Sequence, residues 1–93
     1  MDEEVENPLE VKNSIHFQPN PVSDQLTITF EKPSLDQPYL VRLLSIDGKL
    51  LLERNFNQVR NSLNMRNFES GVYLIEVYLG DEKQEQSKIV ISH

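Results

Sequence analysis

Apolar and polar residues alternate along most of this chain, and this period-two spacing constrains its fold more than any other feature. The clearest stretch is QLTITFE (25–31), in which Leu26, Ile28 and Phe30 share one face. Successive side chains of a β-strand point to opposite faces, so the pattern predicts a strand with one buried face. No long stretch keeps the period of an amphipathic helix. The chain is therefore predicted to be all-β.

Further strand patterns follow, separated by turn signals. We predict strands in YLVRLLS (39–45), KLLLERN (49–55), near residues 59–63, in GVYLIEVYLG (71–80) and in SKIVIS (87–92), with a turn over 80–84. Met65 and Phe68 are expected to tuck under the sheet. The predicted core positions are Leu26, Ile28, Phe30, Val41, Leu43, Tyr73, Ile75, Val77 and Ile89. About seven short strands of this kind predict a small immunoglobulin-like antiparallel β-sandwich.

The hairpin between the second and third of these strand patterns has two plausible registers. A two-residue turn at Asp47-Gly48 would place Arg42 opposite Glu53. A three-residue loop that closes with a bulge at the glycine would bury Leu51 instead. The bulged loop is slightly favoured, because Ser45 is a preferred first residue of such a turn.

Negative charge is concentrated at the start of the chain, whose total net charge is −6. Residues 1–13 hold five acids and one lysine, hence −4, and residues 14–93 hold ten acids and eight bases, hence −2. Nucleic-acid binding needs a basic face, so no nucleic-acid partner is expected. We predict an acidic flexible linker over 1–13 and one folded domain over 14–93.

Nothing in the sequence has the pattern of a catalytic or metal site. The absence of cysteine excludes disulfides and thiolate ligands. The two histidines, His16 and His93, stand far apart in the chain, and the terminal one is expected to fray. The aspartates of the domain fall at turns, where a carboxylate normally caps backbone N–H groups. We therefore expect no enzyme, no catalytic residue, no cofactor and no metal.

The stretch HFQPNPVSD (16–24) sets two prolines around one asparagine just before the clearest strand. Proline fixes its own φ and disfavours the α region for the residue before it. The stretch is therefore predicted to be a stiff, non-helical corner.

With this corner, the order of motifs resembles the type A C-terminal sorting domain of the type IX (Por) secretion system. The corner stands before an alternating strand, a hairpin turn ends in glycine and a basic residue, LNMRNFESGVYLIEV precedes the best strand, and a basic residue precedes a short apolar strand at the end. The resemblance covers residues 14–93. The matching positions are Pro19, Asn20, Pro21, Asp24, Gly48, Lys49, Gly71, Tyr73, Lys88, Ile89, Val90 and Ile91.

This resemblance implies a secretion signal carried behind an N-terminal cargo domain. Its partners would be the type IX translocon and a sortase-like peptidase that removes the domain by cutting within residues 1–13. The protein would pass through the periplasm to the cell surface or the extracellular space. The corner would orient the first strand relative to the linker, at the point where the chain enters the domain.

The alternative function is a non-catalytic adhesion or carbohydrate-binding module. It would need an aromatic platform, and only Tyr39, Tyr78 and Phe56 are expected to face outward. A structural spacer domain is a third hypothesis for the function. Weak self-association through the edge strands is left open by the sequence.

Two positions carry sharper expectations. Gly71 is predicted to occupy a site where a side chain would strain the backbone or clash, so that Gly71→Val costs about 1–3 kcal/mol. Lys88 is predicted to be exposed at the start of the last strand.

Overall fold

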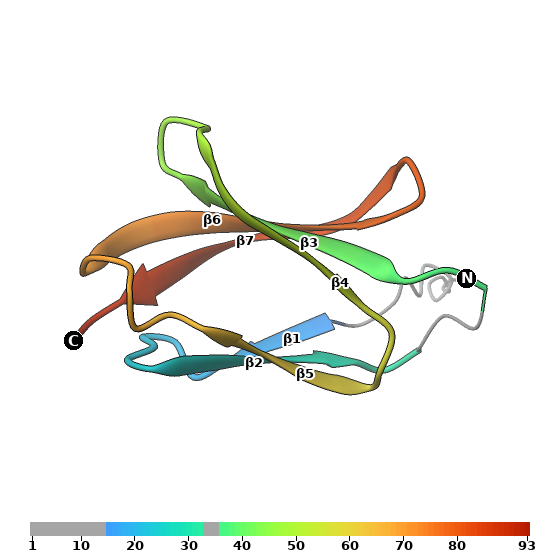
Figure 1. Ribbon diagram of the computed structural model, residues 1–93, viewed down its shortest axis with the longest axis horizontal. Helices are drawn as coiled ribbons and strands as arrows, with labels where there is room; N and C mark the ends of the chain where they lie inside the picture. The colour runs from blue at the N-terminus through green and yellow to red at the C-terminus, as the bar shows by residue number, and fades with distance from the viewer. Residues whose placement is uncertain (1–14, 33–35) are drawn as a thin grey trace, which may run out of the picture.

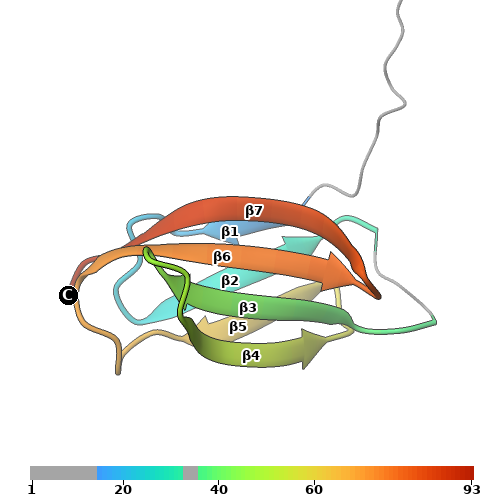
Figure 2. The same ribbon diagram turned by 90° about the horizontal axis from the view of Figure 1, so that it is seen from above.

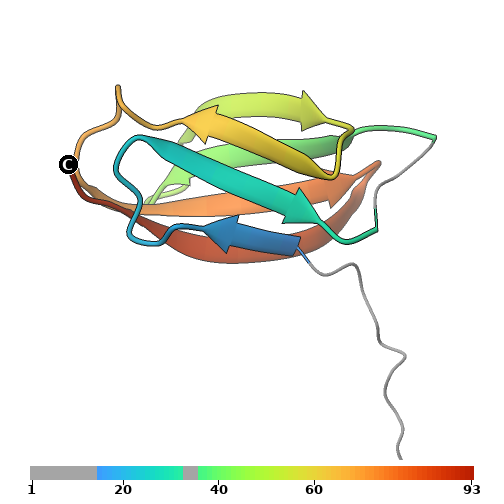
Figure 3. The ribbon, with the colours of Figure 1, turned by 90° about the horizontal axis from the view of Figure 1, so that it is seen from below.

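The computed structural model describes residues 15–32 and 36–93, which form seven strands in two sheets and contain no helix (Figure 1). The strands are β1 (Ile15–Gln18), β2 (Gln25–Phe30), β3 (Tyr39–Ser45), β4 (Leu50–Phe56), β5 (Arg60–Asn64), β6 (Gly71–Leu79) and β7 (Glu82–Ile91). The order is β4-β3-β6-β7 in the sheet nearest the viewer in Figure 2 and β1-β2-β5 in the sheet nearest the viewer in Figure 3. All neighbouring strands are antiparallel. The predicted immunoglobulin-like sandwich is thus confirmed. The predicted linker, residues 1–13, and the domain boundary at residue 14 lie outside the described residues.

The core lies between the two sheets and is apolar throughout. Its buried members are Ile15, Val22, Leu26, Ile28, Phe30, Tyr39, Val41, Leu43, Leu63, Met65, Ile75, Val77, Ile89 and Ile91. Of the predicted core positions only Tyr73 is less than buried, and it packs half-buried against the others. Met65 is buried and Phe68 packs against the same cluster, as predicted. None of the residues that the structure describes belongs to a helix long and apolar enough to cross a membrane.

The β3–β4 hairpin combines features of both predicted registers. Its loop is the favoured one: the N–H of Gly48 donates to the carbonyl of Ser45, and Gly48 has a φ of +93°. A second irregularity, between Leu43 and Leu44, then restores the pairing of Arg42 with Glu53. The expected burial of Leu51 is wrong, because this shift leaves its side chain exposed.

The β6–β7 hairpin is longer than the sequence suggested. Leu79 pairs with Glu82, so the turn consists of Gly80 and Asp81 alone. The predicted turn over residues 80–84 is therefore wrong, and β7 begins five residues before the predicted strand. The added part, Glu82 to Gln86, is polar and pairs with β6 without contributing to the buried core.

Two of the aromatic side chains expected to face outward do not. Tyr39 is 1% exposed and stacks on Phe30 with ring centroids 4.1 Å apart. Its hydroxyl donates to the carbonyl of Lys32 at 2.6 Å. Phe56 is half-buried against the core.

The two ends of the sandwich differ in what they contain. The C-terminal end, at the left of Figure 1, holds the connections 19–24, 46–49 and 65–70 together with residues 92–93. The opposite end holds the start of β1, residues 57–59 and the turn at 80–81. Most of the positions that match the sorting family lie at the C-terminal end.

Candidate functional site at the C-terminal end of the sandwich

Asn20 joins the proline corner to the last strand through its side-chain amide. Its Nδ2 donates to the backbone carbonyl of Lys88 at 3.3 Å, and its Oδ1 accepts from the backbone N–H of Val90 at 2.9 Å. Pro19 and Pro21 on either side have no N–H to donate, and the peptide bonds before both are cis. The Asn20 amide therefore takes the place that a backbone peptide of a neighbouring strand would occupy.

Val22 continues this contact along the edge of β7. Its N–H donates to the carbonyl of Val90 at 2.8 Å, and its carbonyl accepts from the N–H of Ser92 at 2.9 Å. This makes a parallel bridge to Ile91, and the Val22 side chain is fully buried. Val22 was not among the core positions predicted from the sequence. Together the two contacts cover the C-terminal part of an edge strand that would otherwise be open.

The position of the corner overturns its predicted role. Ile15 pairs with Phe30, whereas Gln18 pairs with Thr27. Strand β1 thus begins at the opposite end of the sandwich and reaches the corner only at its last residue (Figure 3). The corner therefore does not lie where the chain enters the domain. It fastens the β1–β2 connection to the other sheet.

The terminal stretch Lys88–Ile91 alternates between the core and solvent. Ile89 and Ile91 are buried, while Lys88 and Val90 face outward. The exposure predicted for Lys88 is confirmed, but its predicted place at the start of the strand is wrong. Because β7 starts at Glu82, Lys88 lies in the second half of the strand.

Gly71 and Tyr73 lie directly beside this stretch, because Gly71 pairs with Ile91 and Tyr73 with Ile89. The predicted strain at Gly71 is wrong. A Cβ added there would meet only the Tyr73 ring, at an ordinary contact distance of 3.7 Å, and Gly71 does not have the left-handed φ found at two other glycines. The Tyr73 hydroxyl donates to the carbonyl of Glu69 at 2.6 Å. It holds the 65–70 connection much as a tyrosine corner does in other sandwiches.

Gly48 and Lys49 end the turn that projects from the same end. Lys49 donates its backbone N–H to Ser45 Oγ at 3.0 Å. The hydrogen bond from the Ser45 hydroxyl, followed by one from its own backbone, lowers the pKa of Asp47 below its ordinary value. This turn is thus ordered by its own polar groups rather than by contact with the core.

The contacts at the C-terminal end, which we call the C-terminal cluster, also include Asp24 and residues 92–93. Asp24 lies 3.5 Å from the guanidinium of Arg66, and its backbone carbonyl accepts from the N–H of Met65. The expected fraying of His93 is wrong: its N–H donates to Ser70 Oγ at 3.0 Å and its Nε2 donates to the carbonyl of Phe68 at 2.6 Å. Segments that are distant in the sequence therefore meet here.

An apolar patch covers the outer face of the four-stranded sheet near this end. It consists of Leu44, Leu50, Val72, Leu74 and Val90, which are joined by cross-strand pairs. Leu50 and Val72 are about half exposed, at 50% and 45%. Lys88 borders the patch, since it pairs with Leu74. The sequence analysis did not predict this patch.

The same face becomes charged toward the opposite end. Arg42 pairs with Glu53 at 2.7 Å, and this hydrogen bond is the main cause that raises the pKa of Arg42 above its ordinary value. Tyr78, expected to face outward, is half-buried, and Arg42 and Lys83 lie within cation–π distance of its ring. The outer face of one sheet is thus divided into an apolar and a charged half.

A metal site would need several His, Cys, Asp or Glu side chains close together. Within ranges 15–32 and 36–93, no group of three or more His, Cys, Asp or Glu side chains could hold a metal ion. His16 donates to Glu31 at 2.9 Å on an exposed edge, and His93 contacts backbone and Ser70.

Comparison with known proteins identifies a family and similar segments in longer proteins. The model of the family described as "Secretion system C-terminal sorting domain" matches residues 16–92. An ulvan lyase of Nonlabens ulvanivorans is 34% identical over 80 residues, which are 85% of this chain and 14% of that protein. A funoran endo-beta-hydrolase of Wenyingzhuangia aestuarii is 30% identical over 73 residues, which are 78% of this chain and 10% of that protein. The chain thus spans about a seventh or less of the length of these relatives.

Proposed function

The chain belongs to the family of type IX secretion system C-terminal sorting domains, and from this premise we propose how its parts serve sorting. Its function is that of a sorting signal, which directs an attached protein to the cell surface or the extracellular space. We propose that its role is recognition rather than catalysis.

We propose that the type IX translocon recognises the C-terminal end of the sandwich. The carrying observation is that family-matching positions from three distant segments meet there: the Asn20 corner, the Gly71–Tyr73 strand start and the Lys88–Ile91 stretch. The neighbouring apolar patch supports this placement, because exposed apolar clusters on small domains commonly mark protein interaction sites. Lys88 would add a charged contact at its border.

A sortase-like peptidase would act at a separate place. The leader, residues 1–13, joins β1 at Ile15, and the register puts Ile15 at the end opposite to Ile91. We propose that cleavage takes place within the leader, after transit through the periplasm. The chain would then be cut on the N-terminal side of Ile15, which lies at the end of the sandwich opposite to the proposed recognition surface.

The cargo is proposed from the relatives. Both named relatives are polysaccharide-degrading enzymes much longer than this chain. We propose a cargo domain of the same kind, joined to the leader on its N-terminal side. The alternative of an aromatic-platform adhesion module has little support, because Tyr39 is buried and Tyr78 and Phe56 are half-buried.

The test is a fusion of residues 1–93 behind a reporter that carries its own signal for export to the periplasm. In a bacterium with a type IX system, we expect the reporter at the cell surface or in the medium. In a matched strain without the translocon, it should stay in the periplasm. Retention in the periplasm of both strains would contradict the proposed function.

A further inference from the structure

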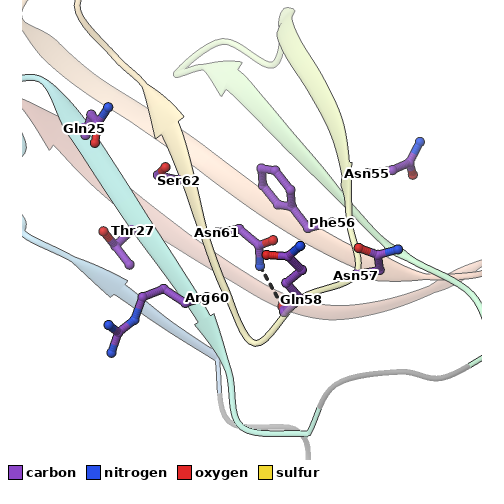
Figure 4. Close-up of a pocket in the computed structure, with 9 residues that line it drawn as sticks. All are labelled: Gln25, Thr27, Asn55, Phe56, Asn57, Gln58, Arg60, Asn61 and Ser62. Atoms are coloured by element: carbon purple, nitrogen blue, oxygen red, sulfur yellow. Dashed lines mark hydrogen bonds between the residues drawn. The ribbon is translucent and has the colours of Figure 1, made fainter.

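A polar trough runs over the three-stranded sheet, away from the C-terminal cluster. One hollow of about 580 Å³ lies over β2, β5 and the β4–β5 connection (Figure 4). A second, of about 400 Å³, lies beside it toward β1. Both are lined by Thr27 and Arg60, so the two hollows are contiguous.

The trough follows a cross-strand row of short polar side chains. Gln18 pairs with Thr27, and Thr27 pairs with Ser62, so the row crosses all three strands. Such a row is about 10 Å long at the usual strand spacing of about 4.8 Å. It therefore offers a shallow bed, with hydroxyls in the middle, that an extended ligand could cross.

Side-chain amides dominate the part of the trough near the β4–β5 connection. Asn55, Asn57, Gln58 and Asn61 all line it, beside Phe56. Asn61 pairs with the buried Ile28, so its amide lies on the other side of the edge strand β5 from Thr27 and Ser62, and the hollow extends around this edge. Asn61 is fixed by a hydrogen bond from its Nδ2 to the carbonyl of Gln58 at 2.8 Å, drawn as a dashed line in Figure 4. An amide group offers both a donor and an acceptor in one plane. A ligand rich in hydroxyl groups needs this mixed set.

Arg60 gives the trough its charge. It is exposed at the point shared by the two hollows, and its guanidinium makes no ion pair or side-chain hydrogen bond within the part of the chain that the structure describes. No acidic side chain lines either hollow, although the chain as a whole carries −6. A guanidinium binds carboxylate, sulfate or phosphate oxygens through paired hydrogen bonds.

We propose that this trough binds an anionic oligosaccharide, with Arg60 on the acidic substituent and the amides and hydroxyls on the sugar hydroxyl groups. An acidic peptide is the less suitable occupant. Peptides dock through apolar grooves or by backbone pairing, whereas the side chains that line this trough are mainly polar. The site is distinct from the C-terminal cluster, so the domain would bind glycans in addition to serving as a sorting signal.

The experiment titrates the 93-residue chain with three oligosaccharides: oligogalacturonate, which is carboxylated, a sulfated carrageenan oligosaccharide, and neutral maltohexaose. Calorimetry should show binding of at least one anionic probe, weakened by salt, with the neutral probe at least about tenfold weaker. The ratio of the two anionic affinities assigns the substituent to carboxylate or sulfate.

Two variants connect this binding to the trough. Arg60→Gln should weaken the anionic probe at least about tenfold. Arg66→Gln, an equal charge change at an exposed arginine that lines none of these hollows, should leave the affinity within about twofold. Ser62 is exposed in the cross-strand row, so the larger side chain of Ser62→Phe should fill the bed and abolish binding.

Four results would overturn the proposal. The first is the absence of binding by both anionic probes. The second is an equal loss of affinity in Arg60→Gln and Arg66→Gln, and the third is full binding by Ser62→Phe, since either would place the ligand elsewhere. The fourth is a poly-glutamate peptide that binds as tightly as the sugars, which would assign the site to acidic peptides.

Discussion

The two ends of this sandwich are built from the same strands but differ in how they are held. At the C-terminal end, the order comes from polar contacts between connections, such as the Asn20 amide on β7 and the Tyr73 hydroxyl on Glu69. At the opposite end, it comes from a short turn at Gly80-Asp81 and from the stack of Phe30 on Tyr39. The positions that match the sorting family are concentrated at the C-terminal end.

The contrast indicates where a recognition signal can lie in a small domain. A stacked aromatic pair is buried and cannot be read by a partner, whereas connections fastened by hydrogen bonds stay exposed and still have fixed positions. The opposite end thus contributes stability, and the C-terminal end combines stability with an accessible surface. Substitutions and truncations at the two ends can test this distinction.

Removal of residues 84–93 should have the largest effect. It deletes the part of β7 that buries Ile89 and Ile91 and leaves the Asn20 corner without a partner. We expect no cooperative unfolding transition in a thermal melt followed by circular dichroism, and no export of a fused reporter. Removal of residues 92–93 alone should leave a cooperative transition. A truncated chain that melts cooperatively would show that β7 is not needed for the fold.

Asn20→Ala should lower the free energy of unfolding by about 1–2 kcal/mol, because it removes two hydrogen bonds to the backbone of β7. The matched change is Asn61→Ala near the opposite end, which removes one exposed hydrogen bond and should cost less than about 1 kcal/mol. Urea denaturation measures both. Equal losses would mean that the Asn20 contacts add nothing beyond an ordinary surface bond.

Gly80 and Gly71 should rank in the reverse order of their match to the family. Gly80, which lies outside the motif, has a φ of +62°, so Gly80→Ala should cost about 1 kcal/mol. Gly71→Ala should stay within about 0.5 kcal/mol, because its Cβ would meet only an ordinary contact. Denaturation midpoints decide this. A larger loss at Gly71 would reinstate the strain that the sequence predicted.

Acidification should produce the smallest effect, at the turn of Asp47. A carboxyl whose pKa is lowered in the folded state stabilises the fold above its unfolded pKa of about 3.9, and this stability is lost as the pH falls through the folded pKa. Both Asp47→Asn and Ser45→Ala should therefore slightly reduce the drop in melting temperature between about pH 6 and about pH 2. An unchanged drop in both variants would remove this turn from the account.

Much of the fold could be predicted because its strands bury one face each. Leu26, Ile28 and Phe30 needed only the period-two rule, and the same rule applied from Val41 backward would have predicted a buried Tyr39. The early start of β7 was missed because its first residues are polar, although Gly-Asp is a known two-residue hairpin signal.

The site could be predicted only in part. Its residues were named from the family resemblance, but the contact of Asn20 with Val90 spans 70 positions of the chain. No local pattern encodes such a contact, because it depends on how two sheets pack. The apolar patch likewise results from strand order, which the sequence leaves open.

The most direct measurement compares export of a reporter fused to the domain with Lys88→Ala and with Lys83→Ala. Both changes remove one exposed lysine from β7, the first beside the apolar patch and the second near the opposite end. Lys88→Ala should change the free energy of unfolding by less than about 0.5 kcal/mol. Lys83→Ala also removes an ion pair with Glu76 and should cost up to about 1 kcal/mol, so both domains should fold. We predict that export falls for Lys88→Ala and stays at the wild-type level for Lys83→Ala. Unchanged export for Lys88→Ala, or a greater fall for Lys83→Ala, would contradict recognition at the C-terminal end.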